Sequence, residues 1–198
     1  MKKYYQIKLS NQKKYIWFLI PKCGSNSIRI FLHKNSEIVS NEKLKEAVHT
    51  GIDWKNYFKF IIVRNSWDRL LSAWQDKAQN QWNANYQFPQ FRIQYFRQFH
   101  DKDFSFFVKN CKINRDPHLR PISDLVDISG IDFIGKLENL QEDFNIICDK
   151  IGIPHQQLPY KNKSNHKHYT EYYDDETRQI VAEKYAKDIE YFGYKFGE

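Results

Sequence analysis

The chain has 198 residues and carries 31 Lys and Arg against 24 Asp and Glu, which gives a formal net charge of +7. This length fits one domain with a proper core, and an aromatic content of 17% with a single Met predicts a core filled by rings. The positive charge suits an anionic ligand. Nucleic acid is a less favoured partner, because the sequence has no zinc-finger spacing, no recognition-helix cluster and no aromatic platform of an RNA-binding sheet.

The cysteine content and the hydropathy pattern indicate where such a chain would work. Three cysteines are an odd number without metal-ligand spacing, so we expect free thiols and a reducing compartment. No apolar run approaches the roughly 20 residues needed to cross a bilayer, and no signal peptide opens the chain. We therefore expect a soluble, cytoplasmic protein without a membrane span.

The first candidate site lies near the start of the chain. A short run over residues 4–7 predicts an edge strand, and residues 15–20 form a continuous aromatic and β-branched run, typical of a strand buried on both faces. A proline ends that run, and a turn of small residues, 24–27, leads into a predicted helix over residues 28–34. Backbone N–H groups and the helix dipole converge at such a junction, and Lys22 adds a positive charge. With hydroxyl donors from the turn serines, this segment predicts a phosphate site.

Three interpretations of this segment compete. The plainest is an ordinary strand-to-helix connection with a serine cap. A nucleoside-triphosphate P-loop would need its Lys after the second Gly, whereas here Lys22 precedes Gly24. The third takes Cys23 and Arg29, spaced Cys-x5-Arg, as the thiolate and arginine of a cysteine-dependent phosphatase. That spacing is easily met by chance, so a second motif is needed to choose between them.

The second motif is another buried strand that runs into a helix. Residues 59–63 are predominantly apolar, and Asn65 or Ser66 is the expected helix cap. Arg64 leaves the end of the strand, and Ser72 lies two turns into the helix. An arginine fork and a hydroxyl in this arrangement predict contacts to one further phosphate near the carboxyl end of the strand.

The middle of the chain, residues 80–111, is rich in aromatic residues. Its second half predicts a helix capped by Asp103, with a buried face made of Phe104, Phe107, Val108 and Cys111. Its first half mixes rings with Arg92, Arg97 and His100, which suits either an acidic sugar or a helix packed on its rings.

Two loops, a strand and two helices complete the chain. A rigid loop over residues 116–121 contains His118, and residues 131–137 predict a buried strand. A helix from Glu138 is expected to stop at Gly152. After a basic loop, a final helix capped by Asp174 is predicted to continue through Phe192.

Together the two motifs resemble the PAPS-dependent sulfotransferases (PAPS is 3′-phosphoadenosine 5′-phosphosulfate), and more closely the carbohydrate branch, sulfotransferase family 2, with its Golgi chondroitin and heparan sulfate enzymes. The family's Pro-Lys-x-Gly-x-x-Ser turn for the 5′-phosphosulfate is matched by residues 21–27, and its Arg-Asn-Pro-x-Asp-Arg-x-x-Ser motif for the 3′-phosphate by residues 64–72. Two departures are Cys23, where Thr is usual, and Ser66, where Pro is usual. The resemblance continues through residues 133–140, 185–188 and 192–194.

The resemblance implies a fold and a reaction. The fold is an α/β, P-loop-like, three-layer domain with a central parallel β-sheet flanked by helices, and one sulfotransferase domain covers residues 1–198. The reaction moves a sulfuryl group from PAPS to a hydroxyl of an acceptor, most simply a carbohydrate, with PAP (3′-phosphoadenosine 5′-phosphate) as the other product. No metal is implied, and no carboxylate cluster offers to bind one. The oligomeric state is left open.

The resemblance also assigns residues. Lys22 is expected to stabilise the leaving group, His49 to act as the base, and His118 to contact the substrate or serve as an alternative base. The residues expected to bind the cosubstrate are Lys22, Cys23, Gly24, Ser25, Asn26, Ser27, Arg64, Ser72, Lys163 and Lys167. Two functions of other classes stay open: the phosphatase that uses Cys23 and Arg29, and a glycan-binding module that has lost catalysis.

Overall fold

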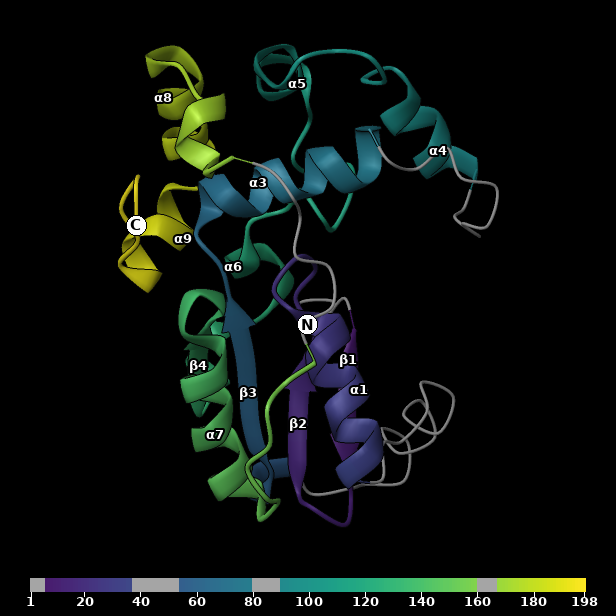
Figure 1. The fold of residues 1–198 in the computed structure, drawn as a ribbon, viewed down its shortest axis with the longest axis vertical. Coiled ribbons are helices and arrows are strands. Elements are labelled where there is room, and N and C mark those ends of the chain that lie inside the picture. The colour runs from purple at the N-terminus through teal and green to yellow at the C-terminus, as the bar shows by residue number, and fades with distance from the viewer. Residues whose placement is uncertain (1–5, 37–53, 80–89, 160–166) are drawn as a thin grey trace. The chain divides into compact units, whose positions relative to one another are not determined.

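The computed structural model of the protein describes residues 6–36, 54–79, 90–159 and 167–198. These residues form two compact units (Figure 1). The first unit combines Met1–Arg64 with Asp124–Lys163, and the second combines Asn65–Ser123 with Ser164–Glu198. The chain therefore crosses between the units directly after Arg64, at the start of the second sequence motif.

The first unit is built on a four-stranded sheet in the order β1-β2-β3-β4. Strands β2, β3 and β4 are parallel, as the sequence predicts, while β1 pairs antiparallel with β2 and makes the sheet mixed. The predicted edge strand is thus present and spans Ile7–Ser10, while residues 4 and 5 of the predicted run lie outside the described residues. The strands and helices of this unit are β1 (Ile7–Ser10), β2 (Tyr15–Phe18), α1 (Ser25–Asn35), β3 (Phe58–Val63), β4 (Phe133–Lys136) and α7 (Leu140–Ile151).

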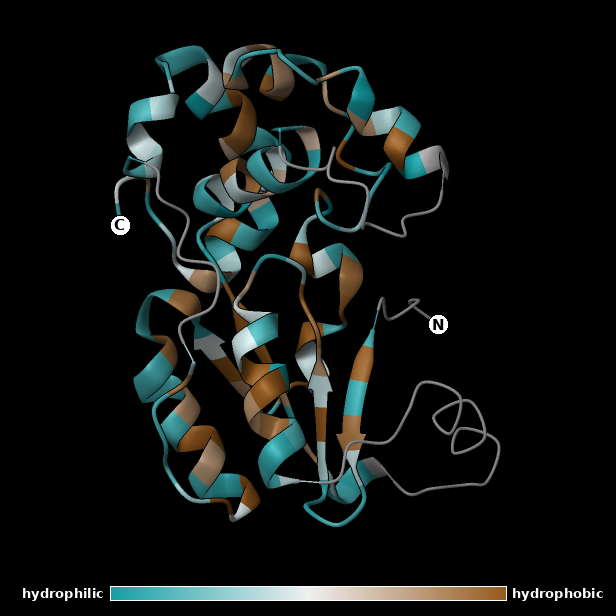
Figure 2. Ribbon diagram, turned by 45° about the vertical axis from the view of Figure 1, so that its right-hand side comes forward, coloured by the Kyte–Doolittle hydropathy of each residue, from teal (hydrophilic) through white to brown (hydrophobic). Residues whose placement is uncertain are grey.

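The aromatic and β-branched runs become strands because both faces of the sheet can bury them. All four residues of β2 are buried, and the rings of Trp17 and Phe60 stack across neighbouring strands at 6.3 Å. Helices α1 and α7 pack on the same face of this sheet, where Phe31 meets Phe144 edge-on at 5.1 Å (Figure 1). Hydrophobic and hydrophilic residues alternate along both helices in Figure 2, as expected of helices with one buried face.

The second unit is helical and has its own core of rings and aliphatic side chains. As predicted, the core includes the helix face of Phe104, Phe107, Val108 and Cys111, together with Phe96 and Phe99 from the preceding aromatic segment. Its helices are α3 (Ser66–Trp74), continued as a π-helix over Gln75–Gln79, α4 (Gln90–Arg97), α5 (Phe104–Asn110), α8 (Asp175–Lys184) and α9 (Ala186–Phe192). The chain returns from the second unit to the first within a single helical turn, α6 (Ile122–Leu125).

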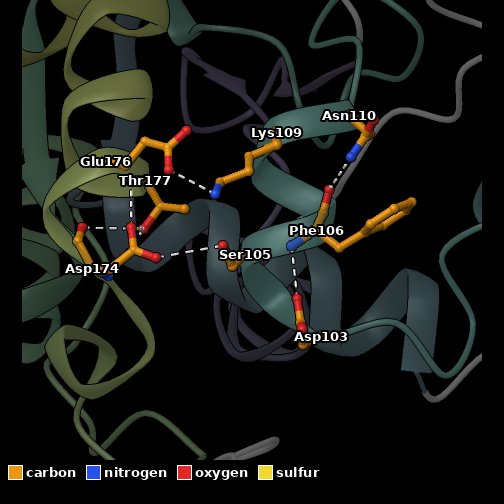
Figure 3. Close-up of polar contacts among 8 residues, drawn as sticks. All are labelled: Asp103, Ser105, Phe106, Lys109, Asn110, Asp174, Glu176 and Thr177. Carbon is orange, nitrogen blue, oxygen red and sulfur yellow. Dashed lines mark hydrogen bonds and ion pairs between the residues drawn. The ribbon is translucent and has the colours of Figure 1, made fainter.

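Helices α5 and α8 begin at the predicted caps and contact each other (Figure 3). Asp103 accepts a hydrogen bond from the N–H of Phe106 at 2.7 Å, and Asp174 accepts one from the N–H of Thr177 at 2.7 Å. The hydrogen bonds from the backbone and side chain of Thr177 keep the pKa of Asp174 below its usual value. Lys109 on α5 pairs with Glu176 on α8 at 2.7 Å, but both side chains are exposed, so the pair contributes little stability.

The C-terminal helix differs from the prediction. One continuous helix was expected through Phe192, but the chain forms α8 and α9 with a break at Tyr185. Tyr185 has φ −116° and ψ 20°, is fully buried, and donates its hydroxyl hydrogen to the carbonyl of Leu119. The helix thus breaks at a residue that is hydrogen-bonded to a distant segment of the chain. The helical periodicity of the sequence does not indicate such a contact.

Candidate active site

The turn between β2 and α1 has the backbone geometry of an anion cradle. Lys22 and Gly24 both adopt left-handed conformations, with φ of 69° and 72°, and α1 starts at Ser25. The first turn of α1 contains no acidic residue, and its N-cap is Gly24, which has no side chain to form a capping hydrogen bond. The helix therefore begins with backbone N–H groups and a positive dipole end that suit a phosphate or sulfate group.

Glycine at position 24 is required for two reasons. Its positive φ is unfavourable for residues with a Cβ atom, and a Cβ built there would lie 2.9 Å from Cδ1 of Leu137 and 3.1 Å from Cδ2 of Leu140. Those leucines follow β4, in the segment that resembles the family beyond the two motifs. The segment after β4 therefore packs directly against Gly24 and supports the turn from one side.

The polar side chains of the turn mainly hold its own backbone. Ser25 donates its hydroxyl hydrogen to the carbonyl of Ile20 at 3.1 Å, which ties the start of α1 to the end of the β2 segment. Cys23 is only 2% exposed, and its Sγ donates to the carbonyl of Pro21 at 3.6 Å. Ser27 is buried, whereas Asn26 is exposed. Contacts from this turn to a ligand would therefore come mainly from backbone N–H groups and from Lys22.

This arrangement gives the phosphatase alternative no support. A cysteine nucleophile must be accessible to its phosphate ester, whereas the Cys23 thiol is buried and directed at a backbone carbonyl. Arg29 is exposed and donates to Asn26 Oδ1 at 3.3 Å, one turn into α1.

Arg64 brings the second motif to the first. Strands β2 and β3 are parallel, so their carboxyl ends lie at the same edge of the sheet. Arg64 follows β3 there, and its Nη1 donates to the carbonyl of Lys22 at 3.2 Å. Lys22 and Arg64, which were predicted from two separate motifs, are thus in contact within the first unit.

Ser72 lies on α3 in the second unit and is half-buried. The N-cap of α3 is Asn65, one of the two predicted candidates, and its Oδ1 accepts from the N–H of Trp67 at 3.1 Å. Asn65 is fully buried and also donates from Nδ2 to the carbonyl of Lys195 at 2.9 Å and to the hydroxyl of Tyr169 at 3.2 Å. The sequence pattern indicates the cap but not these contacts to the C-terminal segment.

His118 is held by a buried carboxylate. Oδ1 of Asp116, a residue that is 1% exposed, lies 2.6 Å from Nδ1 of His118 and accepts from the His118 backbone N–H at 2.9 Å. Nε of Arg92 lies 2.8 Å from the other carboxylate oxygen. Burial acts to raise the pKa of Asp116, but the hydrogen bonds and charge of His118, with the charge of Arg92, outweigh it and lower that pKa below its usual value. Asp116 is therefore ionised at neutral pH and holds the imidazole of His118 through Nδ1.

The remaining predicted site residues are less informative. His49 and Lys163 lie outside the described residues. Lys167 is exposed and pairs with Glu171 at 3.3 Å, an ordinary surface ion pair. Among the side chains that the structure describes, no group of three or more His, Cys, Asp or Glu could hold a metal ion. None of the described helices is long and apolar enough to cross a bilayer.

A mixed β-sheet flanked by helices, with an anion cradle at the carboxyl end of a strand, defines an α/β protein. Comparison with known proteins identifies its family. A model of the sulfotransferase family matches residues 5–195, so the chain belongs to the sulfotransferase family. It is 26% identical to carbohydrate sulfotransferase 9 of Homo sapiens, over 93% of this chain and 48% of that protein. It is 24% identical to carbohydrate sulfotransferase 14 of Danio rerio, over 95% of this chain and 62% of that protein. The chain thus spans about half to three-fifths of the length of these curated relatives. No solved structure matches it.

Proposed function

We propose that the protein transfers a sulfuryl group from PAPS to a hydroxyl group of a carbohydrate. The observation that carries this proposal is the turn of residues 21–27: a helix start whose N-cap is a left-handed glycine, preceded by Lys22 and contacted by Arg64. This donor set fits the 5′-phosphosulfate of PAPS, because it combines backbone N–H groups with positive charge. The family match over residues 5–195 includes both units, and we propose that they act as one sulfotransferase domain.

The nucleotide would be bound by groups from both sequence motifs. Residues 22–27 would hold the 5′-phosphosulfate, mainly through backbone N–H groups, while Arg64 and Ser72 would bind the 3′-phosphate. Lys163 and Lys167 would add charge from the basic loop. Lys22 would neutralise the negative charge that develops on the leaving oxygen, so that this positioned cation contributes directly to the rate.

The transfer itself needs a proton acceptor. A bond forms between sulfur and the acceptor oxygen, the bond from sulfur to the 5′-phosphate oxygen breaks, and PAP departs with the electron pair. The hydroxyl proton of the acceptor passes to a base, and we propose His118 Nε2 for this role, because Asp116 holds the opposite ring nitrogen at 2.6 Å. His49, which the sequence predicts as the base, is the competing candidate.

The acceptor class rests on the relatives, both of which are named carbohydrate sulfotransferases. A net charge of +7 is compatible with an acidic glycan as well as with the nucleotide. Neither feature separates an active enzyme from a glycan-binding module that has lost catalysis. An intact Lys22 favours the enzyme, because a binding module has no use for a residue that stabilises a leaving group.

Calorimetric titration with PAP tests the proposal without an acceptor. We expect saturable binding to the wild type that is weakened at least tenfold in Lys22→Ala, because the ammonium group contributes a charge-assisted contact. The wild type should then convert PAPS to PAP in the presence of chemically desulfated chondroitin, with label appearing on the glycan. Absence of PAP binding would rule the proposal out. PAP binding without transfer to a panel of desulfated glycans would favour a different acceptor or the module without catalysis.

A further inference from the structure

Arg69 belongs by sequence to the nucleotide motif of residues 64–72, yet its side chain contacts a different part of the protein. It is 2% exposed, and its guanidinium donates to the carbonyl of Arg120 at 2.7 Å and to that of Pro117 at 3.2 Å. Both carbonyls belong to the segment around His118. A buried guanidinium is costly unless it is hydrogen-bonded, so these contacts fix where it lies.

Two more buried side chains contact the same segment from the C-terminal region. Tyr185 donates its hydroxyl hydrogen to the carbonyl of Leu119. Asp188, which is fully buried, accepts from the N–H groups of Ile122 at 2.5 Å and Ser123 at 2.9 Å. Burial raises the pKa of Tyr185 far above its usual value, so its hydroxyl stays protonated and remains a donor at neutral pH.

Residues 117–123, here called the His118 loop, are therefore held by long-range side-chain contacts along most of their length. Arg69, Tyr185 and Asp188 come from α3, the break between α8 and α9, and α9 itself, and together they bind backbone groups on both sides of His118. Asp116 then fixes the imidazole on that backbone. Because the backbone and the ring are each held by buried groups, His118 has one defined position within the second unit.

We propose that Arg69, Tyr185 and Asp188 are positioning residues for His118, and that Arg69 does not bind the nucleotide despite its place in the nucleotide motif. This inference rests on the proposed function, since it assigns His118 a role in sulfuryl transfer. Ser72 lies one turn further along the helix that carries Arg69. One helix therefore presents both the residue proposed for the 3′-phosphate and the residue that holds the His118 loop.

The test compares Arg69→Lys and Tyr185→Phe with a matched control, Tyr173→Phe. Tyr173 also donates its hydroxyl hydrogen to a backbone carbonyl of the second unit, that of Trp67 at 2.9 Å, but it has no hydrogen bond to the His118 loop. Small displacements of a catalytic group cost up to about 100-fold in rate. We therefore expect kcat to fall about 10- to 100-fold in Arg69→Lys and about 3- to 10-fold in Tyr185→Phe, with PAP affinity within about threefold of wild type. Tyr173→Phe should keep kcat within about twofold.

Two readouts make the comparison decisive. The first is PAPS turnover, with desulfated chondroitin as acceptor and separately with water, which divides effects between kcat and the KM for PAPS. The second is amide hydrogen exchange, which needs no acceptor: residues 117–123 should exchange at least about tenfold faster in Arg69→Lys and Tyr185→Phe, and not in Tyr173→Phe. If Arg69→Lys does not fold, the two tyrosine variants provide the same comparison.

Three results would overturn the inference. A fall in PAP affinity as large as the fall in kcat would make Arg69 a nucleotide ligand. Equal losses of kcat in Tyr185→Phe and Tyr173→Phe would show that the loss comes from a general fall in stability and not from the position of His118. Unchanged exchange over residues 117–123 in both loop variants would show that these side chains do not hold the loop. Failure of the wild type to bind PAP would instead remove the proposed function, and the exchange data would still report on the loop.

Discussion

The anion turn of residues 21–27 and the His118 loop of residues 117–123 are built in opposite ways. In the turn, the supporting contacts are mostly local: Ser25 bonds to Ile20, Cys23 to Pro21, and a left-handed Gly24 starts the helix. In the His118 loop, support comes from buried side chains about 50 to 70 positions away in sequence, such as Arg69 and Asp188.

This difference has a consequence for how each region responds to mutation. The turn owes its shape to short-range bonds, to the approach of Leu137 and Leu140 to Gly24, and to the hydrogen bond from Arg64 to the carbonyl of Lys22. In the loop, local hydrogen bonds tie His118, Leu119 and Arg120 to Asp116, but the buried contacts from Arg69, Tyr185 and Asp188 depend on the helical core of the second unit being correctly packed. Substitutions in the turn should therefore change nucleotide binding directly, whereas substitutions far from the loop should change the rate through His118.

The largest expected effect concerns the base. We expect His118→Ala to lower kcat about 10²–10⁴-fold while PAP affinity stays nearly unchanged, because proton transfer would lose its acceptor and the nucleotide contacts would remain. Steady-state kinetics on one accepted glycan, with calorimetry for PAP, measure this. His155→Ala is the matched control, since His155 and Asp149 form a similar pair at 2.7 Å that is exposed on the surface. If His49→Ala carries the whole loss and His118→Ala only raises the acceptor KM, the base is His49.

The next effect concerns the 3′-phosphate. Arg64→Ala should weaken PAP binding about 10- to 150-fold, which corresponds to the roughly 1.5–3 kcal/mol of a hydrogen bond to a charged group. Adenosine 5′-phosphate lacks the 3′-phosphate, so its affinity should fall far less. Calorimetry with both nucleotides measures the difference, and Arg29→Ala serves as a neighbouring arginine that should have no effect. Equal losses for the two nucleotides would remove the 3′-phosphate assignment from Arg64.

A smaller effect concerns Gly24, where backbone strain can be distinguished from the close approach of Leu137 and Leu140. Gly24→Ala and Gly152→Ala both place a Cβ on a residue with positive φ, which should cost about 1–2 kcal/mol of stability in each case. Only at position 24 would the new Cβ also meet Leu137, and only there should PAP affinity fall as well. Thermal unfolding and PAP titration of both variants test this. Equal PAP affinity in the two variants would show that the turn does not depend on this close approach.

The smallest effect concerns the unusual Cys23. Its thiol is buried and donates to a backbone carbonyl, a contact that a serine hydroxyl can replace, so Cys23→Ser should keep kcat within about tenfold. A thiolate nucleophile would not survive this change, because a serine at the same position would not be ionised. Hydrolysis of an aryl phosphate by the wild type that disappears in Cys23→Ser would favour the phosphatase over the sulfotransferase.

Local sequence rules were sufficient for much of the fold. The sequence predicts Asp103 and Asp174 as helix caps, Gly152 as the end of α7, and the apolar runs before Pro21 and Arg64 as buried strands, and the structure confirms each. Each of these features depends on residues a few positions apart, so a single segment contains the information. The parallel sheet implied by the family resemblance also accounts for the contact of Arg64 with the turn, because parallel strands end at the same edge of a sheet.

Other features depended on contacts that no single segment contains. Helix α8 breaks at Tyr185, whose buried hydroxyl bonds to Leu119, although the helical pattern continues through Phe192. Arg69 and Arg64 belong to one short motif, yet one arginine contacts the His118 loop and the other contacts the anion turn. The direction of a long charged side chain is decided by which distant carbonyls remain to be satisfied once the core has packed, and only the tertiary structure supplies them.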